Sequence, residues 1–289
     1  MSIDIKLSFF LDRDRCLEAA LTANSQAAGM EVKYLQTQPP REVYRSTNVN
    51  STQITIPLAQ ARGINALALI RHNLTVDALV HLYGHSVNDF SNLSAVDFKL
   101  ENQDLFPPII GFGEGGFGEG TFGGQPDPED MPLYSESSWF AFADQELRYW
   151  FLKIEDPTNP DGYIQIGRMM LGTGWQPQYG IDWDHSIESV DPSKQERTDG
   201  GGMVVDIEPQ YRRFALSCSG LTEDERYMRA FNMMQRLGRN QAFFMILFPD
   251  PAKNDSIFEA GYVIAVDAAP IARHRREFSK ARFVFDELI

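Results

Sequence analysis

The sequence predicts a mostly β protein built from two domains, and three observations lead to that prediction. The chain has 289 residues, enough for two domains of about 100–150 residues each. Its 22 glycines and 16 prolines are spread along the chain, and aromatic residues, including 20 Phe, reach 12%. Apolar runs of strand length recur between turn-like segments, a pattern that favours short strands over a helical bundle.

Charge and cysteine content exclude several classes of protein. The chain has 26 Lys and Arg against 40 Asp and Glu, a formal charge of −14. It offers no basic stripe, so nucleic acid is not an expected partner. Cys16 and Cys218 are too few for a disulfide framework or a zinc site, and they favour synthesis in a reducing compartment.

Neither a membrane span nor a signal peptide is expected. The longest apolar runs, such as Ala242–Phe248, fall far short of the roughly 20 residues that a spanning helix needs. Asp4 and Lys6 interrupt the first ten residues, where a signal peptide would have an unbroken apolar core.

The first two thirds of the chain read as strands, after a weak helical pattern over Leu11–Ala28. The expected strands are Ile54–Leu58, Ile64–Arg71, Ala78–Gly84, Trp139–Phe142, Arg148–Glu155 and Tyr163–Leu171. Turns are expected at Ala61–Gly63 and Asn73–Asp77. The Pro- and Gly-containing segment 156–162 predicts that the last two strands form an antiparallel pair.

A Phe/Gly-rich segment interrupts these strands at about residues 106–124. Eight of the fourteen residues from Gly111 to Gly124 are glycine, so a fixed conformation is entropically costly. Phe112, Phe117 and Phe122 recur every five residues and are the candidate anchors at a subunit interface. The alternative is a loop folded back on its own domain.

The last third is expected to be a second β domain with one helix. A polar run, Ile187–Gly202, ends in three glycines, a pattern typical of a domain boundary. It predicts a linker over residues 173–202 and a second domain over residues 203–289. The expected strands are Met203–Glu208, Tyr211–Ser219, Gln241–Phe248, Ala260–Ala269 and Lys280–Leu288.

The segment Thr222–Leu237 carries every local signal of a helix. Thr222 and Glu225 have the spacing of a capping box, and Gly238 stands where a helix-ending glycine belongs. Helical spacing predicts a buried face with Tyr227, Phe231 and Met234.

Several motifs suggest binding sites, but each has a structural interpretation that we prefer. Gly111–Gly116 matches G-x-G-x-x-G, yet prolines precede it and more glycines follow, so no strand and helix frame a dinucleotide. His81 and His85 would lie on the same strand face about 13 Å apart, too far to share a metal, at roughly 3.3 Å per residue. His72 and Asn73 are expected to cap a corner of the chain.

Asp156, Asn159 and Asp161 supply oxygen atoms on a turn, as a calcium site would. Their spacing misses the calcium-loop pattern, and an ordinary Asx-Pro turn is the preferred interpretation. We therefore expect no catalytic, cofactor or metal site, and no enzyme activity.

Three stretches of the first part of the chain carry a family pattern: EVYRS at Glu42–Ser46, ITIPLAQARGINALALIRHNLT at Ile54–Thr75, and RYWFLKIED with GYIQIGRMMLG. On these motifs, residues 3–172 resemble the galactose-binding-like, discoidin-type jelly-roll family. The resemblance implies a jelly-roll β-sandwich as the first domain, residues 1–172.

The combination of this jelly roll, the Phe/Gly-rich insertion and the C-terminal motifs RRFALSCSGLTEDERYM and FFMILFPDP resembles proteins of the tail-tip region of long-tailed bacteriophages. The C-terminal third is similar in its order of elements to the β-sandwich-plus-helix domain of tail-tube and distal tail proteins. This resemblance implies a β-sandwich with a helix, and a virion protein of the tail tip or baseplate made in the host cytoplasm. Its implied partners are other tail proteins and copies of itself in a ring or hub, with a role in host-surface attachment.

The alternative function is a carbohydrate-binding module for host surface glycans, and a glycan-degrading enzyme is a third hypothesis. In the binding module, Trp139, Trp175 and Trp183 are the candidates to stack on sugar faces.

Overall fold

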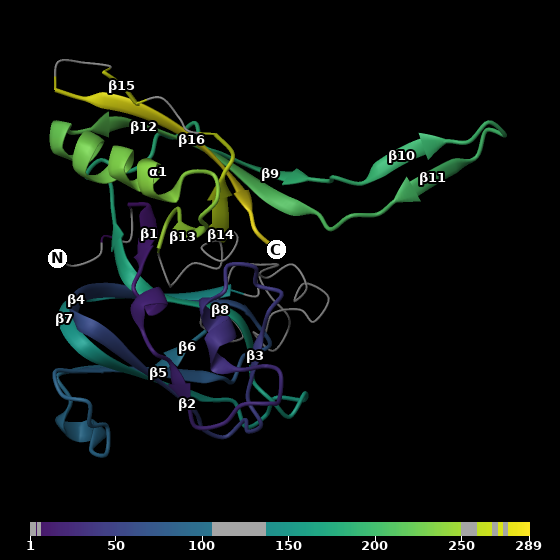
Figure 1. Ribbon diagram of the computed structural model, residues 1–289. Helices are drawn as coiled ribbons and strands as arrows, with labels where there is room; N and C mark the ends of the chain where they lie inside the picture. Colours follow the sequence, from purple (N-terminus) through teal and green to yellow (C-terminus); the bar gives the residue numbers. More distant parts are fainter. Residues whose placement is uncertain (1–3, 5–6, 106–136, 250–258, 268–270, 274–276) are drawn as a thin grey trace, which may run out of the picture. The chain divides into compact units, whose positions relative to one another are not determined.

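The computed structural model describes residues 4, 7–105, 137–249, 259–267, 271–273 and 277–289. The predicted Phe/Gly-rich insertion with Phe112, Phe117 and Phe122 lies outside these residues. The chain divides into two compact units (Figure 1): unit 1 is Met1–Gln176 with Phe244–Gly261, and unit 2 is Pro177–Phe243 with Tyr262–Ile289. No helix within the described ranges is long and apolar enough to cross a membrane.

Over its described residues, unit 1 is an antiparallel β structure with three short 3₁₀ turns. Its elements are β1 (Phe9–Asp14), η1 (Cys16–Glu18), β2 (Thr22–Ala23), η2 (Val32–Gln36), β3 (Tyr44–Arg45), β4 (Thr52–His72), β5 (Leu79–His85), η3 (Leu93–Ala95), β6 (Phe98–Asp104), β7 (Ser137–Glu155) and β8 (Gln165–Trp175). Strand β13 (Phe243–Ile246) pairs with β1.

Two long strands, β4 and β7, belong to both layers of unit 1. The first half of β4 and the second half of β7 pair from Thr52↔Ile154 to Pro57↔Tyr149, and β5 and β6 continue that layer. The second half of β4 pairs with the first half of β7 and with β8, which leads on to β1. Both halves of β4 contribute to one buried core, so the layers face each other as a sandwich. The predicted class, mostly β with a jelly-roll-type sandwich first, is confirmed.

A bulge takes the place of the turn that the sequence predicts at Ala61–Gly63. Pairing shifts between Pro57↔Tyr149 and Arg62↔Leu147, so several residues of β4 oppose Arg148 alone. Arg148 Nε donates to the Leu58 carbonyl oxygen at 3.2 Å. Because a bulge bends a strand without ending it, what the sequence predicts as two strands is one strand.

Two further predictions for unit 1 are wrong. Leu11–Ala28 is not a helix: its first residues end β1, and η1 and β2 follow. Residues 148–155 and 163–171 are not paired, because β7 pairs with β4 and β5 while β8 pairs with β4, β1 and β3. The turn between them carries the chain from one layer to the other.

Unit 2 is an antiparallel sheet with a helix. Its elements are β9 (Ser186–Val190), β10 (Lys194–Arg197), β11 (Met203–Asp206), β12 (Tyr211–Leu221), the π-helical segment η5 (Glu225–Phe231), α1 (Asn232–Leu237), β14 (Ala260–Ala265), β15 (Ile271–Arg273) and β16 (Ser279–Glu287). Strand β12 lies between β9 and β16, and β16 also pairs with β14 and β15. Phe214 and Phe285 face each other across β12 and β16, and both are fully buried.

The glycines at 200–202 form the turn of a hairpin inside unit 2. Thr198 N–H donates to the Gly202 carbonyl oxygen at 2.9 Å, and Gly201 has a φ of 82°, which favours glycine. The chain passes between the units first at Gln176–Pro177 and again after Phe243 and after Gly261, whereas the sequence pattern predicts that the second domain starts at residue 203. A polar run ending in glycines is as typical of an exposed hairpin as of a linker, which explains the difference.

The helix has the predicted ends but a different buried face. Glu225 N–H donates to Thr222 Oγ1 at 3.4 Å and Thr222 N–H to Glu225 Oε2 at 3.1 Å, the reciprocal bonds of a capping box. Its first turns are π-helical, and the extra residue of a wide turn rotates the face. Tyr227 and Phe231 are therefore half exposed, while Met234 is buried as predicted.

Substitutions on this helix test which of its faces is buried. Met233 is fully buried, so Met233→Ala should lower the free energy of unfolding by about 2–5 kcal/mol. Phe231→Ala should lower it by less than about 1 kcal/mol, because the ring is 49% exposed. Urea unfolding of the two variants checks this, and a larger loss for Phe231→Ala would contradict the helix phase.

Candidate functional site

A row of polar side chains crosses the outer face of the β4–β7–β5 layer. The register places Gln53 opposite Lys153 and Lys153 opposite His81. Side chains alternate between the faces of a strand, and the neighbouring Ile54 and Leu82 belong to the core. The row therefore faces away from the core.

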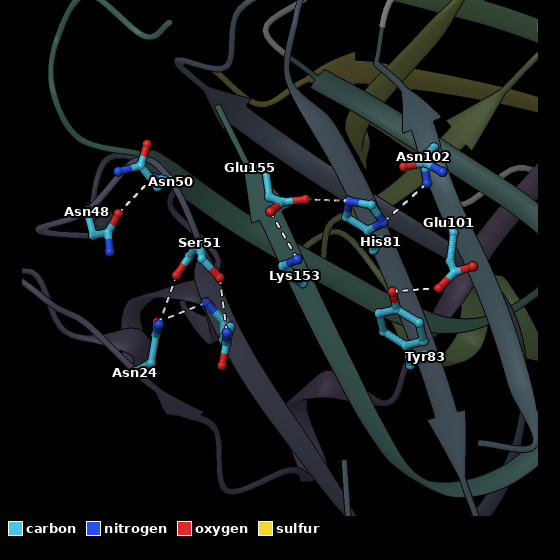
Figure 2. A network of polar contacts seen from close by, with 11 residues as sticks. Asn24, Asn48, Asn50, Ser51, His81, Tyr83, Glu101, Asn102, Lys153 and Glu155 are labelled. Carbon is cyan, nitrogen blue, oxygen red and sulfur yellow. Dashed lines mark hydrogen bonds and ion pairs between the residues drawn. The ribbon is translucent and has the colours of Figure 1, made fainter. Parts of the chain in front are cut away.

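Glu155 connects two members of this row (Figure 2). Its Oε2 lies 3.0 Å from His81 Nε2 and its Oε1 lies 3.0 Å from Lys153 Nζ. The His81 side chain is 8% exposed, whereas Lys153 and Glu155 are 25% and 33% exposed. The buried His81 imidazole thus orients the Glu155 carboxylate, which solvent can reach.

A bulge in β6 supplies the other partner of His81. The pairing of β5 and β6 shifts between Val80↔Gln103 and Leu82↔Leu100, and Asn102 has a φ of 52°. This geometry turns the Asn102 N–H toward the imidazole, where it donates to His81 Nδ1 at 3.2 Å. Since Nδ1 accepts, the ring donates from Nε2 to Glu155. We call Gln53, His81, Glu101, Asn102, Lys153 and Glu155 the outer-face cluster.

The electrostatics of the cluster keep Glu155 ionised. Burial alone would raise the pKa of Glu155, but the hydrogen bond and charge of Lys153, together with the hydrogen bond from His81, outweigh it and hold the pKa below its ordinary value. The carboxylate is therefore a hydrogen-bond acceptor at neutral pH, beside an ammonium group that donates.

Aromatic side chains support the cluster from one side. Tyr83 stacks parallel to His81 with ring centroids 6.4 Å apart, and it packs with Phe151 and Phe90. Its hydroxyl donates to Glu101 Oε1 at 2.9 Å (Figure 2). Burial and the Glu101 carboxylate raise the pKa of Tyr83 to about 12, so this donor keeps its proton.

Asn24 fixes the edge of the layer beside Gln53. Its Nδ2 donates to the Ser51 carbonyl oxygen at 2.8 Å, and its Oδ1 accepts from the Gln53 N–H at 2.9 Å (Figure 2). Gln53 Nε2 donates to Ser51 Oγ at 3.0 Å. These bonds pair backbone groups at the start of β4 and hold Gln53 in line with the row.

The three tryptophans proposed for sugar stacking differ in exposure and belong to two different units. Trp175 is buried against Phe10, with ring centroids 5.5 Å apart, so it offers no face to a ligand. Trp139 is half-buried on β7 in unit 1. Trp183 is 93% exposed and belongs to unit 2.

The corner residues have the structural role that the sequence predicts. His72 is buried, with Nε2 at 2.8 Å from Ser138 Oγ and Nδ1 accepting the Leu74 N–H at 3.3 Å. Burial lowers its pKa to about 4, so it stays neutral. Asn73 Oδ1 accepts the Gln165 N–H at 2.7 Å, which joins the corner to β8.

The residues considered for calcium form an Asx turn. Asp156 accepts from Thr75 Oγ1 at 2.6 Å and from Asn159 Nδ2 at 2.9 Å. Asp161 accepts from Asn73 Nδ2 at 2.8 Å. Within the described ranges, no three His, Cys, Asp or Glu side chains form a group that could hold a metal ion.

The sequence matches no family model and no curated protein. Among solved structures, it is similar to chitosan-binding module 1 of a Paenibacillus chitosanase/glucanase, at 11% identity and a TM-score of 0.37 over 56% of this chain and 99% of that one. It is also similar to a Streptococcus pneumoniae fucose-binding module, at 9% identity and a TM-score of 0.37 over 56% of this chain and 98% of that one. A Clostridium perfringens structure in complex with GalNAc-β-1,3-galactose matches at 11% identity and a TM-score of 0.35 over 57% of this chain and 99% of that one. Scores this low assign neither a function nor a residue.

Proposed function

We propose that unit 1 is a carbohydrate-binding module and that the outer-face cluster binds the glycan. The observation that carries the proposal is the partly exposed Lys153–Glu155 pair, which His81 holds on the outer face of the sheet. Each sugar hydroxyl both donates and accepts a hydrogen bond, so two neighbouring hydroxyls suit an ammonium group beside a carboxylate. The Asn102 side chain, exposed beside His81, adds an amide that can do both.

The contacts inside the cluster favour binding because they fix the groups before a ligand arrives. Glu155 has two partners and His81 has two, so little side-chain freedom remains to be lost on binding. The proposal agrees with the chitosan- and fucose-binding modules named above, and it rests on these side chains.

Catalysis is a poorer use of the same groups. Glycoside hydrolysis requires a carboxyl group whose pKa is raised, so that it can protonate the leaving oxygen. The pKa of Glu155 is lowered instead, and both ring nitrogens of His81 are occupied by hydrogen bonds. We therefore propose a module without catalytic activity.

A glycan array probed with the full chain, followed by calorimetry with the best ligand, tests the proposal. Glu155→Gln and Lys153→Met should each weaken binding about tenfold or more, because hydrogen bonds to charged groups contribute about 1.5–3 kcal/mol. Lys33→Met is the matched control, since Lys33 makes an exposed ion pair with Glu31 in unit 1. An array without any bound glycan, or a ligand whose affinity neither cluster variant changes, would overturn the proposal.

A second candidate is a structural component of a bacteriophage tail tip, assembled from copies of this chain and other tail proteins. The exposed β10–β11 ribbon favours it, since Met203, Val204 and Val205 are 58%, 57% and 43% exposed. Glycan binding by unit 1 would serve host attachment in such a particle. Immunogold labelling of purified particles tests this candidate: label at the tail tip is expected, and particles without label would contradict it.

A further inference from the structure

Arg45 of unit 1 is a half-buried arginine whose charge has no carboxylate partner among the described residues. Other arginines that are at least partly buried do pair with a carboxylate, and these are Arg15, Arg62, Arg168, Arg212, Arg213 and Arg226. A partly desolvated cation without a counter-ion is costly. An anion that binds beside Arg45 would therefore lower the free energy of the folded chain.

The strand register places Arg45 on the outer face of the layer that contains β8. Across β3 and β8, Arg45 pairs with Gln165 and Tyr44 pairs with Ile166. Tyr44 and Ile166 belong to the core, and side chains alternate between the faces of a strand, so Arg45 and Gln165 face away from the core. The outer-face cluster lies on the other layer of unit 1, so the two sets of residues are separate.

Two neighbours fix the Arg45 guanidinium group in place. Its Cζ lies 3.9 Å from the centroid of the Tyr163 ring, a cation–π contact. Its Nε and Nη2 both donate to Gln165 Oε1, at 3.3 and 2.7 Å. Neither neighbour is a carboxylate, so together they orient the cation without neutralising its charge. Little side-chain freedom remains to be lost when a ligand binds.

One edge of the guanidinium group remains open. Gln165 occupies the edge formed by Nε and Nη2, whereas Nη1 has no partner among the described residues and is not sealed from solvent. The N–H bonds of Nη1 and Nη2 at the open end run parallel, which matches two oxygens of a carboxylate or of a tetrahedral oxyanion. The acidic residues nearby in sequence do not use this end: Glu42 is exposed, and Asp161 accepts from Asn73 Nδ2 at 2.8 Å.

We infer that Arg45, Tyr163 and Gln165 form a second binding site of unit 1, which takes the carboxylate or sulfate group of an acidic sugar. We call these three residues the Arg45 site. The anionic group is inferred from Arg45, whereas the sugar that carries it rests on the proposed function. The formal charge of −14 disfavours a long polyanion such as nucleic acid, so a sugar with a single anionic group suits the site better.

NMR titrations of the full chain with galacturonic acid, galactose 6-sulfate and galactose test this inference. The three sugars share one ring and differ at C6, which carries a carboxylate, a sulfate or a neutral hydroxyl. The Arg45 Nε–H resonance should show a saturable shift with at least one acidic sugar. The affinity should be about tenfold or more above that for galactose, because hydrogen bonds to charged groups are the stronger ones. Which acidic sugar binds distinguishes the carboxylate from the sulfate.

Two substitutions of Arg45 separate its charge from its geometry. Arg45→Met removes the cation and should weaken binding of the acidic sugar about tenfold or more. Arg45→Lys keeps the cation but not the parallel pair of N–H bonds, so it should also weaken binding. Lys33→Met is the matched control, since it removes the same charge from an exposed ion pair of unit 1, and it should bind like the wild type. Circular dichroism checks that each variant is folded.

Acidic sugars that bind no better than galactose would overturn the inference, and so would acidic-sugar binding that persists unchanged in both Arg45 variants. Neither result concerns the outer-face cluster. A neutral array ligand whose binding is lost in Glu155→Gln would still support the proposed function, so the two failures are distinguishable.

Discussion

Gly172→Ala should destabilise unit 1 by about 3 kcal/mol, because a Cβ at this position has no room. It would lie 1.9 Å from the Arg13 carbonyl oxygen and 2.9 Å from the Arg13 carbonyl carbon, both backbone atoms. Gly172 pairs with Asp14 of β1 on one side and with Ala66 of β4 on the other. Strand β1 would have to separate from β8 to admit the methyl group.

Hydrogen exchange of the slowest amides of β4 and β8 measures this loss within unit 1. Gly200→Ala is the matched control, because a Cβ there meets nothing within 4 Å. Its effect should stay within about 0.5 kcal/mol. Equal protection in Gly172→Ala and the wild type would show that β1 and β8 are not as close as described.

Arg168→Met should cost about 3–5 kcal/mol at pH 7.5, since it leaves a carboxylate buried without its cation. Arg168 Nη2 lies 2.7 Å from Asp14 Oδ2, and the two side chains are 4% and 6% exposed. Arg168 also donates to the Gln36 carbonyl oxygen, and the Cys16 N–H donates to Asp14 Oδ1 at 2.9 Å. The pair thus joins β1, β8 and η2.

The pH dependence has a definite sign. Burial raises the pKa of Asp14 from 3.8 to about 6, despite the attraction of Arg168. The folded chain therefore binds this proton more tightly than the unfolded chain. Protonation of Asp14 therefore adds to the free energy of unfolding. This contribution is fully present below about pH 4 and is lost as the pH rises through about 6. At about 1.4 kcal/mol per pKa unit it is on the order of 3 kcal/mol.

Arg168→Met should consequently show a smaller deficit at pH 5 than at pH 7.5, because protonation neutralises Asp14 when no cation does. Thermal and urea unfolding at both pH values provide the measurement. Lys33→Met removes one partner of an exposed ion pair, so it should leave the unfolding midpoint unchanged at either pH. The same deficit at both pH values would mean that Asp14 does not titrate in this range.

Features decided within a few residues could be predicted from the sequence. The capping box of Thr222 and Glu225 and the glycine at 238, with a φ of 54°, set the helix ends locally. Strand alternation correctly placed His81 and His85 on one face. The helix phase could not be predicted, because the wide turn depends on which residues tertiary packing buries.

Features decided by long-range pairing were out of reach. The residues at Leu58–Ala61 are compatible with either a bulge or a turn. They form a bulge because β4 pairs with the same partner strand, β7, on both sides of them. The outer-face cluster joins His81 to Glu155, which are 74 residues apart in the sequence. Alternation in RYWFLKIE could have placed Lys153 and Glu155 on the outer face, but not beside His81.

The central claim, that the outer-face cluster binds a glycan, is tested most directly by NMR. The histidine ring resonances of the full chain are followed while the best ligand from the array is added. Our account predicts a saturable shift of the His81 resonance that is lost in Lys153→Met, while His185 of unit 2 stays unchanged. A bound sugar that leaves His81 unshifted, or that shifts only His185, would contradict glycan binding at the outer-face cluster.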